Sequence, residues 1–255
     1  MAAAEVLLET QNLKKHFGGL KAVDGVDFKV NEGGLISIIG PNGAGKTTFF
    51  NLISGTLRPT AGKIFFRGRV VTGYPAHKLA QMGLGRSYQI TNIFPRLTVL
   101  ENVRLACQSA GEDNFKFWQH YKKFPWYEEK AYSILEKVRL KGRELQPTLS
   151  LPQGDKRKLE VAIALARDPK LLLLDEPTAG ISTEELPELT NLIEDIKSEG
   201  AQTIILVEHR MDVVTAISDR ITVLNRGRIL AEGTPQEIMD NEEVQKAYLG
   251  GGGGE

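Results

Sequence analysis

The chain has 255 residues, and its 32 lysines and arginines balance 32 aspartates and glutamates, so that the formal net charge is zero. This balance argues against a general electrostatic attraction to nucleic acid or anionic lipid, and the single cysteine, Cys107, excludes an internal disulfide. Apolar residues make up 41% of the sequence, but no apolar run is as long as a membrane span and the N-terminus does not resemble a secretory signal. We therefore expect a soluble, intracellular, globular protein.

The first third of the chain contains short runs of strand-forming residues. Leu35–Ile39 is a predicted strand that breaks at Gly40, and helix-forming residues follow Lys46. Lys63–Phe66 is a second predicted strand. These runs indicate an α/β arrangement near the N-terminus.

The middle of the chain, residues 95–165, has mainly helical patterns. Thr98 and Glu101 form a capping box, and an apolar stripe at helical spacing follows it. Further helical patterns run through Glu128–Val138 and Lys156–Arg167. We interpret this region as a helical subdomain inserted into an α/β core.

The last third returns to strands. Leu171–Leu174 and Thr203–Val207 are continuous apolar runs, as strands that are covered on both faces require. Between them, Leu186–Lys197 predicts a helix. Ile221–Leu224 and Ile229–Ala231 flank a turn sequence and predict a hairpin.

The segment between the first strand and its helix fits the phosphate-binding pattern GxxxxGK[ST]. Its glycines let the backbone wrap closely around a phosphate, and the helix N-terminus adds the positive end of its dipole. Lys46 is expected to reach the β- and γ-phosphates, and the Thr47 hydroxyl is expected to ligate Mg²⁺. The residues predicted to bind the nucleotide here are Gly40, Pro41, Asn42, Gly43, Ala44, Gly45, Lys46, Thr47 and Thr48.

Two carboxylates, Asp175 and Glu176, follow the apolar run Leu171–Leu174. A buried strand presents such residues at the sheet edge where ligands bind in open α/β sheets. Asp175 is predicted to hold Mg²⁺, and Glu176 to orient or deprotonate the attacking water. A strand end with acids that cap the next helix is the alternative for this pair alone.

Lys46 and Asp175 are far apart in the sequence, with the whole helical region between them, which does not suit the small GTPases. The chain instead resembles the ATP-binding cassette (ABC) ATPases, whose remaining motifs follow here in that family's order. The resemblance implies that the Phe17 ring lies against adenine and that Gln89 senses Mg²⁺ and the attacking water. It also implies that His209 contacts the γ-phosphate and assists catalysis.

The resemblance implies one ABC ATPase domain over residues 1–255, of the α/β class. Its P-loop NTPase core would contain a mixed sheet, an N-terminal antiparallel β region and the inserted helical subdomain. We expect the nucleotide-binding core in residues 1–94 and 166–249, and the helical (signature) subdomain in residues 95–165. Residues 250–255, which include five consecutive glycines, are predicted to be a flexible tail.

Two segments depart from the family's usual motifs. The signature segment has Pro152 where a serine is common, but it keeps Gly154, whose backbone can approach an anion at a helix N-terminus. Gly154 is therefore expected to close over ATP that is bound to a second chain. The charged run Lys156–Lys158 is interpreted as a solvated helix face. In the D-loop, Ser182 stands where aspartate or asparagine is usual, and it is predicted to start the next helix as a cap.

Several stretches are similar to one subgroup, the ATPase subunits of branched-chain (hydrophobic) amino-acid importers. They are residues 17–23, 86–89, 94–103, 159–162, 207–209, 232–235 and 247–250. The resemblance implies ATP and Mg²⁺ as cofactors, and a dimer with a second copy or a related ATPase that closes on ATP. Such a dimer would drive integral-membrane permease subunits at the cytoplasmic face of the cell membrane, and a substrate-binding protein would be an indirect partner.

Alternatives remain open at this point. A DNA- or ribosome-associated ABC ATPase would share the phosphate motifs, but the chain lacks a long heptad insertion and a second cassette. A regulatory module without turnover is disfavoured because Lys46, Asp175, Glu176 and His209 are all present. Aromatic residues between Phe115 and Tyr127 are interpreted as packing or a partner contact rather than as a platform for nucleic acid, which is not expected as a partner.

Overall fold

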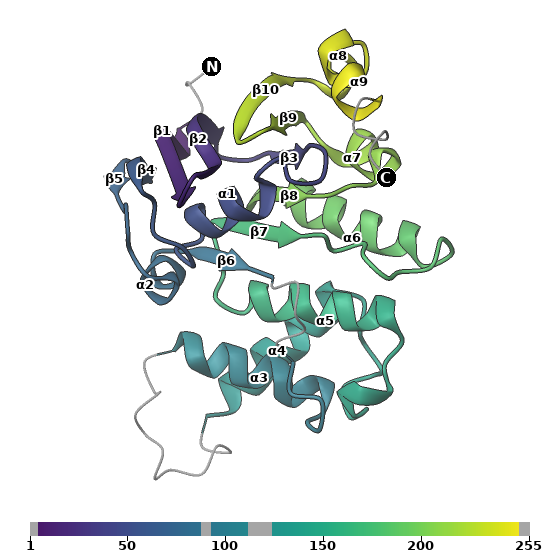
Figure 1. The fold of residues 1–255 in the computed structure, drawn as a ribbon. Coiled ribbons are helices and arrows are strands. Elements are labelled where there is room, and N and C mark those ends of the chain that lie inside the picture. The colour runs from purple at the N-terminus through teal and green to yellow at the C-terminus, as the bar shows by residue number, and fades with distance from the viewer. Residues whose placement is uncertain (1–4, 88–92, 112–123, 250–255) are drawn as a thin grey trace.

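A computed structural model describes residues 5–87, 93–111 and 124–249, in which two β-sheets pack together and helices cover the larger one (Figure 1). The strands are β1 (Val6–Phe17), β2 (Leu20–Asn31), β3 (Leu35–Ile39), β4 (Ala61–Phe66), β5 (Arg69–Val70), β6 (Leu84–Arg86), β7 (Leu171–Asp175), β8 (Thr203–Val207), β9 (Arg220–Asn225) and β10 (Arg228–Gly233). The helices are α1 (Lys46–Ile53), α2 (Ala76–Gln81), α3 (Val99–Ala110), α4 (Pro125–Lys137), the 3₁₀ turn η2 (Thr148–Ser150), α5 (Gln153–Leu165), α6 (Leu186–Ser198), α7 (Met211–Ile217), α8 (Pro235–Met239) and α9 (Glu242–Leu249).

The larger sheet is mixed and has six strands in the order β10-β9-β3-β8-β7-β6. β3 pairs in parallel with both β8 and β9, and β7 pairs in parallel with β6 and β8, whereas β10 is antiparallel to β9. The carboxyl ends of β3, β7 and β8 therefore meet at one edge, where open α/β sheets bind their ligands. The smaller, antiparallel sheet has the order β2-β1-β4-β5.

The hydrophobic core lies on both faces of the parallel strands because successive strand residues point in opposite directions. Leu172 and Leu174 belong to a cluster that includes side chains of α3, α4, α5 and α6. Leu171 and Leu173 belong to a second cluster, which includes α1 and the antiparallel sheet. The inserted helices thus pack against one face of the sheet and the antiparallel sheet against the other (Figure 1).

The strands predicted as continuous apolar runs are confirmed. Leu35–Ile39 and Thr203–Val207 match β3 and β8 residue for residue, and β7 extends its predicted run by one residue, Asp175. The capping box of Thr98 is also confirmed, since its hydroxyl accepts from the Glu101 N–H at 3.1 Å. Helices α4 and α5 each begin three residues before the predicted patterns and end within two residues of them.

The prediction for the charged run at the start of α5 is wrong. It was expected to be a solvated helix face, but the Arg157 and Lys158 side chains are only 8% and 5% exposed. Lys158 Nζ lies 3.0 Å from Asp155 Oδ1 and 2.7 Å from Glu188 Oε1, and Arg157 pairs with Glu160 at 2.8 Å. This helix face is covered by α6 and the segment before it, so its charges form a buried ion network.

Ser182 acts one turn earlier than predicted. Its hydroxyl accepts from the Glu185 N–H at 3.3 Å, which is one half of a capping box, and donates to the Glu185 carboxylate at 3.2 Å. Helix α6 nevertheless begins at Leu186, because the residues between the two form a hydrogen-bonded turn. Ser182 therefore stabilises the turn that leads into the helix.

Helices long and apolar enough to cross a bilayer are absent from the described residues. Cys107, on α3, is buried in the helical cluster. Burial raises the pKa of the Cys107 thiol to about 11, so that the thiol is protonated at neutral pH.

Candidate nucleotide-binding site

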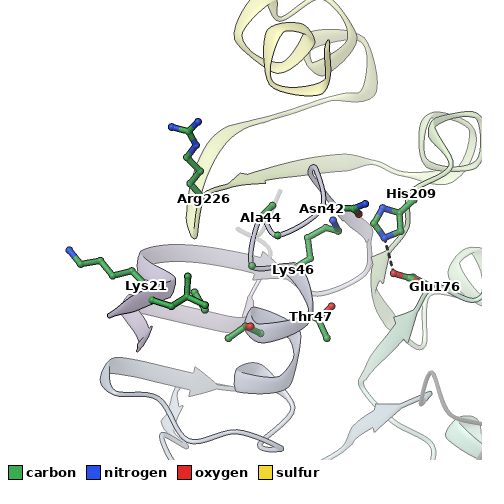
Figure 2. Close-up of a pocket in the computed structure, with 13 residues that line it drawn as sticks. Lys21, Asn42, Ala44, Lys46, Thr47, Glu176, His209 and Arg226 are labelled. Carbon is green, nitrogen blue, oxygen red and sulfur yellow. Dashed lines mark hydrogen bonds and ion pairs between the residues drawn. The ribbon is translucent and has the colours of Figure 1, made fainter. Parts of the chain in front are cut away.

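A cavity of about 500 Å³ opens at the edge where β3, β7 and β8 end (Figure 2). One wall is the loop between β3 and α1 together with the start of that helix, and the far wall is residues 20–22 and Arg226. Glu176 and His209, which follow β7 and β8, close the remaining side. Of the predicted phosphate-binding residues, this cavity is lined by Asn42, Gly43, Ala44, Gly45, Lys46, Thr47 and Thr48. Gly40 and Pro41 lie at the base of the same loop.

Glycine is required at two positions of this loop. Gly40 has φ +150°, and a Cβ there would lie 2.1 Å from the Leu224 carbonyl oxygen. Gly45, which precedes α1, has φ +101°, and a Cβ there would lie 2.3 Å from the Ala22 carbonyl oxygen. Both positions need a left-handed backbone and a close approach, which only glycine allows.

Segments from both ends of the chain support the loop from behind. The Gly227 N–H donates to the Ala44 carbonyl at 2.9 Å, and the Asp24 N–H donates to the Gly227 carbonyl at 2.8 Å. Arg228 adds an ion pair with Asp24 at 2.8 Å. The loop is therefore held between β2 and the β9–β10 hairpin, and within it the Ala44 N–H donates to the Pro41 carbonyl at 3.1 Å.

Lys46 begins α1 with its ammonium group folded back over the loop. Its Nζ donates to the Gly40 and Pro41 carbonyls, at 2.6 and 3.0 Å. Burial lowers the pKa of Lys46, and the nearby negative charge of Glu176 opposes that shift. A partly desolvated ammonium bound only to carbonyls is well suited to exchange them for phosphate oxygens. This cradle, together with the uncapped α1 N-terminus, fits a polyphosphate.

Glu176 and His209 face each other across the cavity mouth, as Figure 2 shows. His209 Nε2 lies 2.7 Å from Glu176 Oε1, so that two side chains predicted to act at the γ-phosphate are in contact. Glu176 has φ +48°, a conformation that non-glycine residues rarely adopt. Its N–H donates to the Val207 carbonyl at 2.9 Å, which holds the turn against the end of β8.

Asp175 ends β7 and is almost fully buried, with 3% of its side chain exposed. Burial raises its pKa, and the Arg86 guanidinium opposes that shift through an ion pair of 3.2 Å. Arg86 also donates to the Ser54 and Thr56 hydroxyls, at 2.5 and 3.1 Å. Sequence analysis missed this arginine, because nothing in its local pattern marks a partner 89 positions away.

The donor set fits Mg²⁺ held mainly through phosphate oxygens. Among the described residues, no group of three or more His, Cys, Asp or Glu side chains is arranged to hold a metal ion. Thr47 lines the cavity and can contribute one oxygen, whereas Asp175 lies outside the lining and is paired with Arg86, so the nucleotide and water would supply most of the ligands. Gln89, the third predicted metal contact, lies outside the described residues.

Two further predicted contacts lie apart from the cavity lining. Phe17 ends β1, where its backbone pairs with that of Leu20, a lining residue, and the residue is 48% exposed. Gly154 is buried at the start of α5, and a Cβ there would lie 3.0 Å from Glu185 Oε1. Its position outside the cavity is compatible with the prediction that it meets the nucleotide of a second chain.

The comparisons with known proteins agree with this geometry. The family model described as ABC transporter matches residues 23–179, and a model described as branched-chain amino acid ATP-binding cassette transporter matches residues 228–253. The high-affinity branched-chain amino acid transport ATP-binding protein BraF of Pseudomonas aeruginosa is 41% identical over 251 residues. That match covers 96% of this chain and 98% of BraF.

Solved structures agree as well. A crystal structure of an ABC transporter's ATP-binding cassette in its ADP conformation has a TM-score of 0.85 and 32% identity, and covers 96% of this chain and 99% of the other. A dimeric cassette in a post-hydrolysis state, bound to ADP and Pi, has a TM-score of 0.76 and 25% identity, with 90% and 99% covered. With its fold, its phosphate loop and these likenesses, the chain belongs to the ABC transporter family of ATP-binding cassette proteins.

Proposed function

We propose that this chain hydrolyses ATP to power an importer of branched-chain or other hydrophobic amino acids. The observation that carries the proposal is the contact between Glu176 and His209 at the mouth of a glycine-lined phosphate cradle. The substrate class follows from the BraF relative and from the C-terminal family match. No finding favours a DNA- or ribosome-associated role.

The residues around the cavity have distinct roles in this proposal. The loop N–H groups and Lys46 bind the phosphates, and Phe17 lies against the adenine. Thr47 and Asp175 hold Mg²⁺ together with Gln89, and the bound ion neutralises phosphate charge. Glu176 accepts a proton from the attacking water, and His209 fixes the Glu176 carboxylate and donates toward the γ-phosphate.

The working unit is a dimer. Gly154 lies at the start of α5 and outside the cavity lining, so in this proposal it meets the nucleotide of another chain and not that of its own. A second cassette, either a copy of this chain or a related ATPase, would present its Gly154 segment to the nucleotide in this cavity. The dimeric ADP-bound neighbour supports this arrangement.

Permease subunits are expected to dock at the junction of the helical subdomain and the core. A groove of about 220 Å³ separates α2 from α3 and α5, and it is lined largely by small residues. Phe94 and Leu149, near the start of α3, are 58% and 70% exposed, and the Leu149 N–H donates to the carbonyl of Pro95. Docked on its permeases in this way, the protein would lie at the cytoplasmic face of the membrane.

The test is to purify the tagged chain from detergent-solubilised native membranes and to identify what accompanies it by mass spectrometry. We expect two multispanning permeases and a second cassette, with a substrate-binding protein encoded nearby. Recovery of DNA or ribosomes without a permease would refute the transport role. In parallel, the Glu176→Gln chain should form an ATP-dependent dimer and lose steady-state ATPase activity, whereas equal phosphate release by both chains would exclude Glu176 as the base.

A further inference from the structure

A second carboxylate, that of Glu208, lies directly behind the Glu176–His209 contact. Glu208 follows β8 and is 2% exposed. Its Oε1 accepts from both the N–H and the hydroxyl of Thr178, at 2.9 and 2.6 Å, and its Oε2 accepts from the His209 N–H at 3.1 Å. A buried carboxylate thus receives three hydrogen bonds from two segments.

These bonds join the two strand ends that carry the reacting side chains. Thr178 lies two residues after Glu176, in the turn that leaves β7, and it is itself 4% exposed. His209 directly follows Glu208 at the end of β8. The Glu208 carboxylate therefore bridges the Glu176 turn and the His209 turn, in addition to the backbone bond from Glu176 to Val207 and the pairing of β7 with β8.

The hydrogen bonds to the buried Glu208 carboxylate give a physical reason why the two turns resist separation. An ionised carboxylate in a buried site is stable only when its oxygens are satisfied, and hydrogen bonds to a charged acceptor are about twice as strong as neutral ones. Moving either turn would leave part of that charge without a donor. Glu208 does not line the cavity, so it has no path to the nucleotide except through its neighbours.

We propose that Glu208 is a positioning residue, whose buried carboxylate fixes the distance between Glu176 and His209 by binding the turns that carry them. This role rests on the proposed ATPase reaction. It predicts that Glu208 affects the chemical step and not the binding of ATP, because the phosphate loop and Lys46 come from another part of the chain. A misplacement of about 1 Å near a reacting centre can lower a rate by about a hundredfold.

The test compares the full-length wild-type chain with Glu208→Gln, an isosteric change that removes the charge and turns an N–H₂ group toward one donor. We expect kcat for ATP hydrolysis to fall at least about tenfold, with KM and the affinity for a fluorescent ATP analogue within about twofold of wild type. Thr178→Val, which removes only the hydroxyl bond, should lower kcat in the same way, and Thr178→Ser should regain activity relative to it.

The matched control is Glu232→Gln. Glu232 also accepts from a threonine hydroxyl, that of Thr222 at 2.8 Å, but it is exposed, lies in the β9–β10 hairpin and is outside the cavity lining. Its kcat should equal that of the wild type. The double variant Glu208→Gln with Thr178→Val should lose less than the product of the single losses, because both remove one interaction.

Three outcomes would overturn the inference: unchanged kcat in Glu208→Gln, an equal loss in Glu232→Gln, or a loss of nucleotide affinity that accounts for the lower rate. If Glu208→Gln does not fold, the contrast between the valine and serine variants of Thr178 decides the question. A wild-type dimer without ATP turnover would instead refute the proposed function, and this role with it.

Discussion

The ion network at the start of α5 gives a quantitative prediction for Lys158→Met. The Lys158 ammonium is buried between two carboxylates, Asp155 at 3.0 Å and Glu188 at 2.7 Å. Methionine has a similar length and no charge, so the substitution removes both ion pairs and leaves the packing of the stem almost unchanged. It therefore measures the electrostatic contribution of the buried amine.

The expected loss follows from what the two carboxylates retain. Breaking a buried ion pair costs about 3–5 kcal/mol when it leaves an uncompensated buried charge. Here Asp155 keeps a second ion pair, with Arg143 at 2.9 Å, and the Glu188 side chain is 49% exposed and can turn to water. We therefore expect a smaller loss, about 1–3 kcal/mol of unfolding free energy. For a chain of this size, 2 kcal/mol corresponds to a Tm lowered by about 4–8 °C.

The assay is thermal unfolding followed by circular dichroism at low and moderate salt. The control is Lys141→Met, which breaks the Lys141–Glu136 pair of 2.6 Å, whose two side chains are 73% and 64% exposed. The control should have the same Tm as the wild type, because water solvates such exposed pairs and salt screens them. If the Tm of Lys158→Met equals or exceeds that of the wild type, the network does not stabilise this fold and our account of the buried run is wrong.

Three other results are expected. Gly45→Ala should abolish nucleotide binding, measured by calorimetry, because the new methyl group would lie 2.3 Å from a backbone oxygen. The control is Gly33→Ala, where φ is +87° but nothing lies within 4 Å, and this variant should bind nucleotide normally. Cys107 should resist iodoacetamide at pH 8 in the folded chain, because with a pKa of about 11 only about one thiol in a thousand is ionised. In urea the thiol should react readily. Rapid labelling of the folded chain would contradict the burial of Cys107. EDTA should stop ATP turnover while the fluorescent ATP analogue stays bound, and added Mg²⁺ should restore it; turnover that persists in EDTA would remove the metal role from Thr47 and Asp175.

The features predicted well from sequence are those in which one short segment contains the whole signal. The loop from Gly40 to Thr47 has its glycines, its lysine and its helix start in eight consecutive positions, and the apolar runs of β3, β7 and β8 are long enough to identify buried strands. The placement of Glu176 and His209 at one edge follows from the parallel order of those strands.

Other features depend on partners distant in the chain. The strands β1 and β2 were not predicted individually, because polar residues and register shifts interrupt their alternation. The burial of Lys158 depends on Glu188 and α6, about thirty positions away, which a helical pattern alone cannot reveal. Glu208 reads locally as a polar residue that ends an apolar run, and its partner Thr178 lies 30 positions earlier.

The support behind the phosphate loop has a consequence for the order in which the protein is made. The loop itself leaves the ribosome early, yet its backing includes the Gly227 bond to Ala44 and the Arg228 pair with Asp24, which joins residues 204 positions apart. Contacts this distant in sequence form late, and the hairpin that supplies them emerges only with the last part of the chain. We therefore expect a nascent or prematurely terminated chain, which has the complete GxxxxGKT sequence but lacks this support, to bind nucleotide weakly. Such a chain would not compete for a partner's place in the nucleotide-bound dimer.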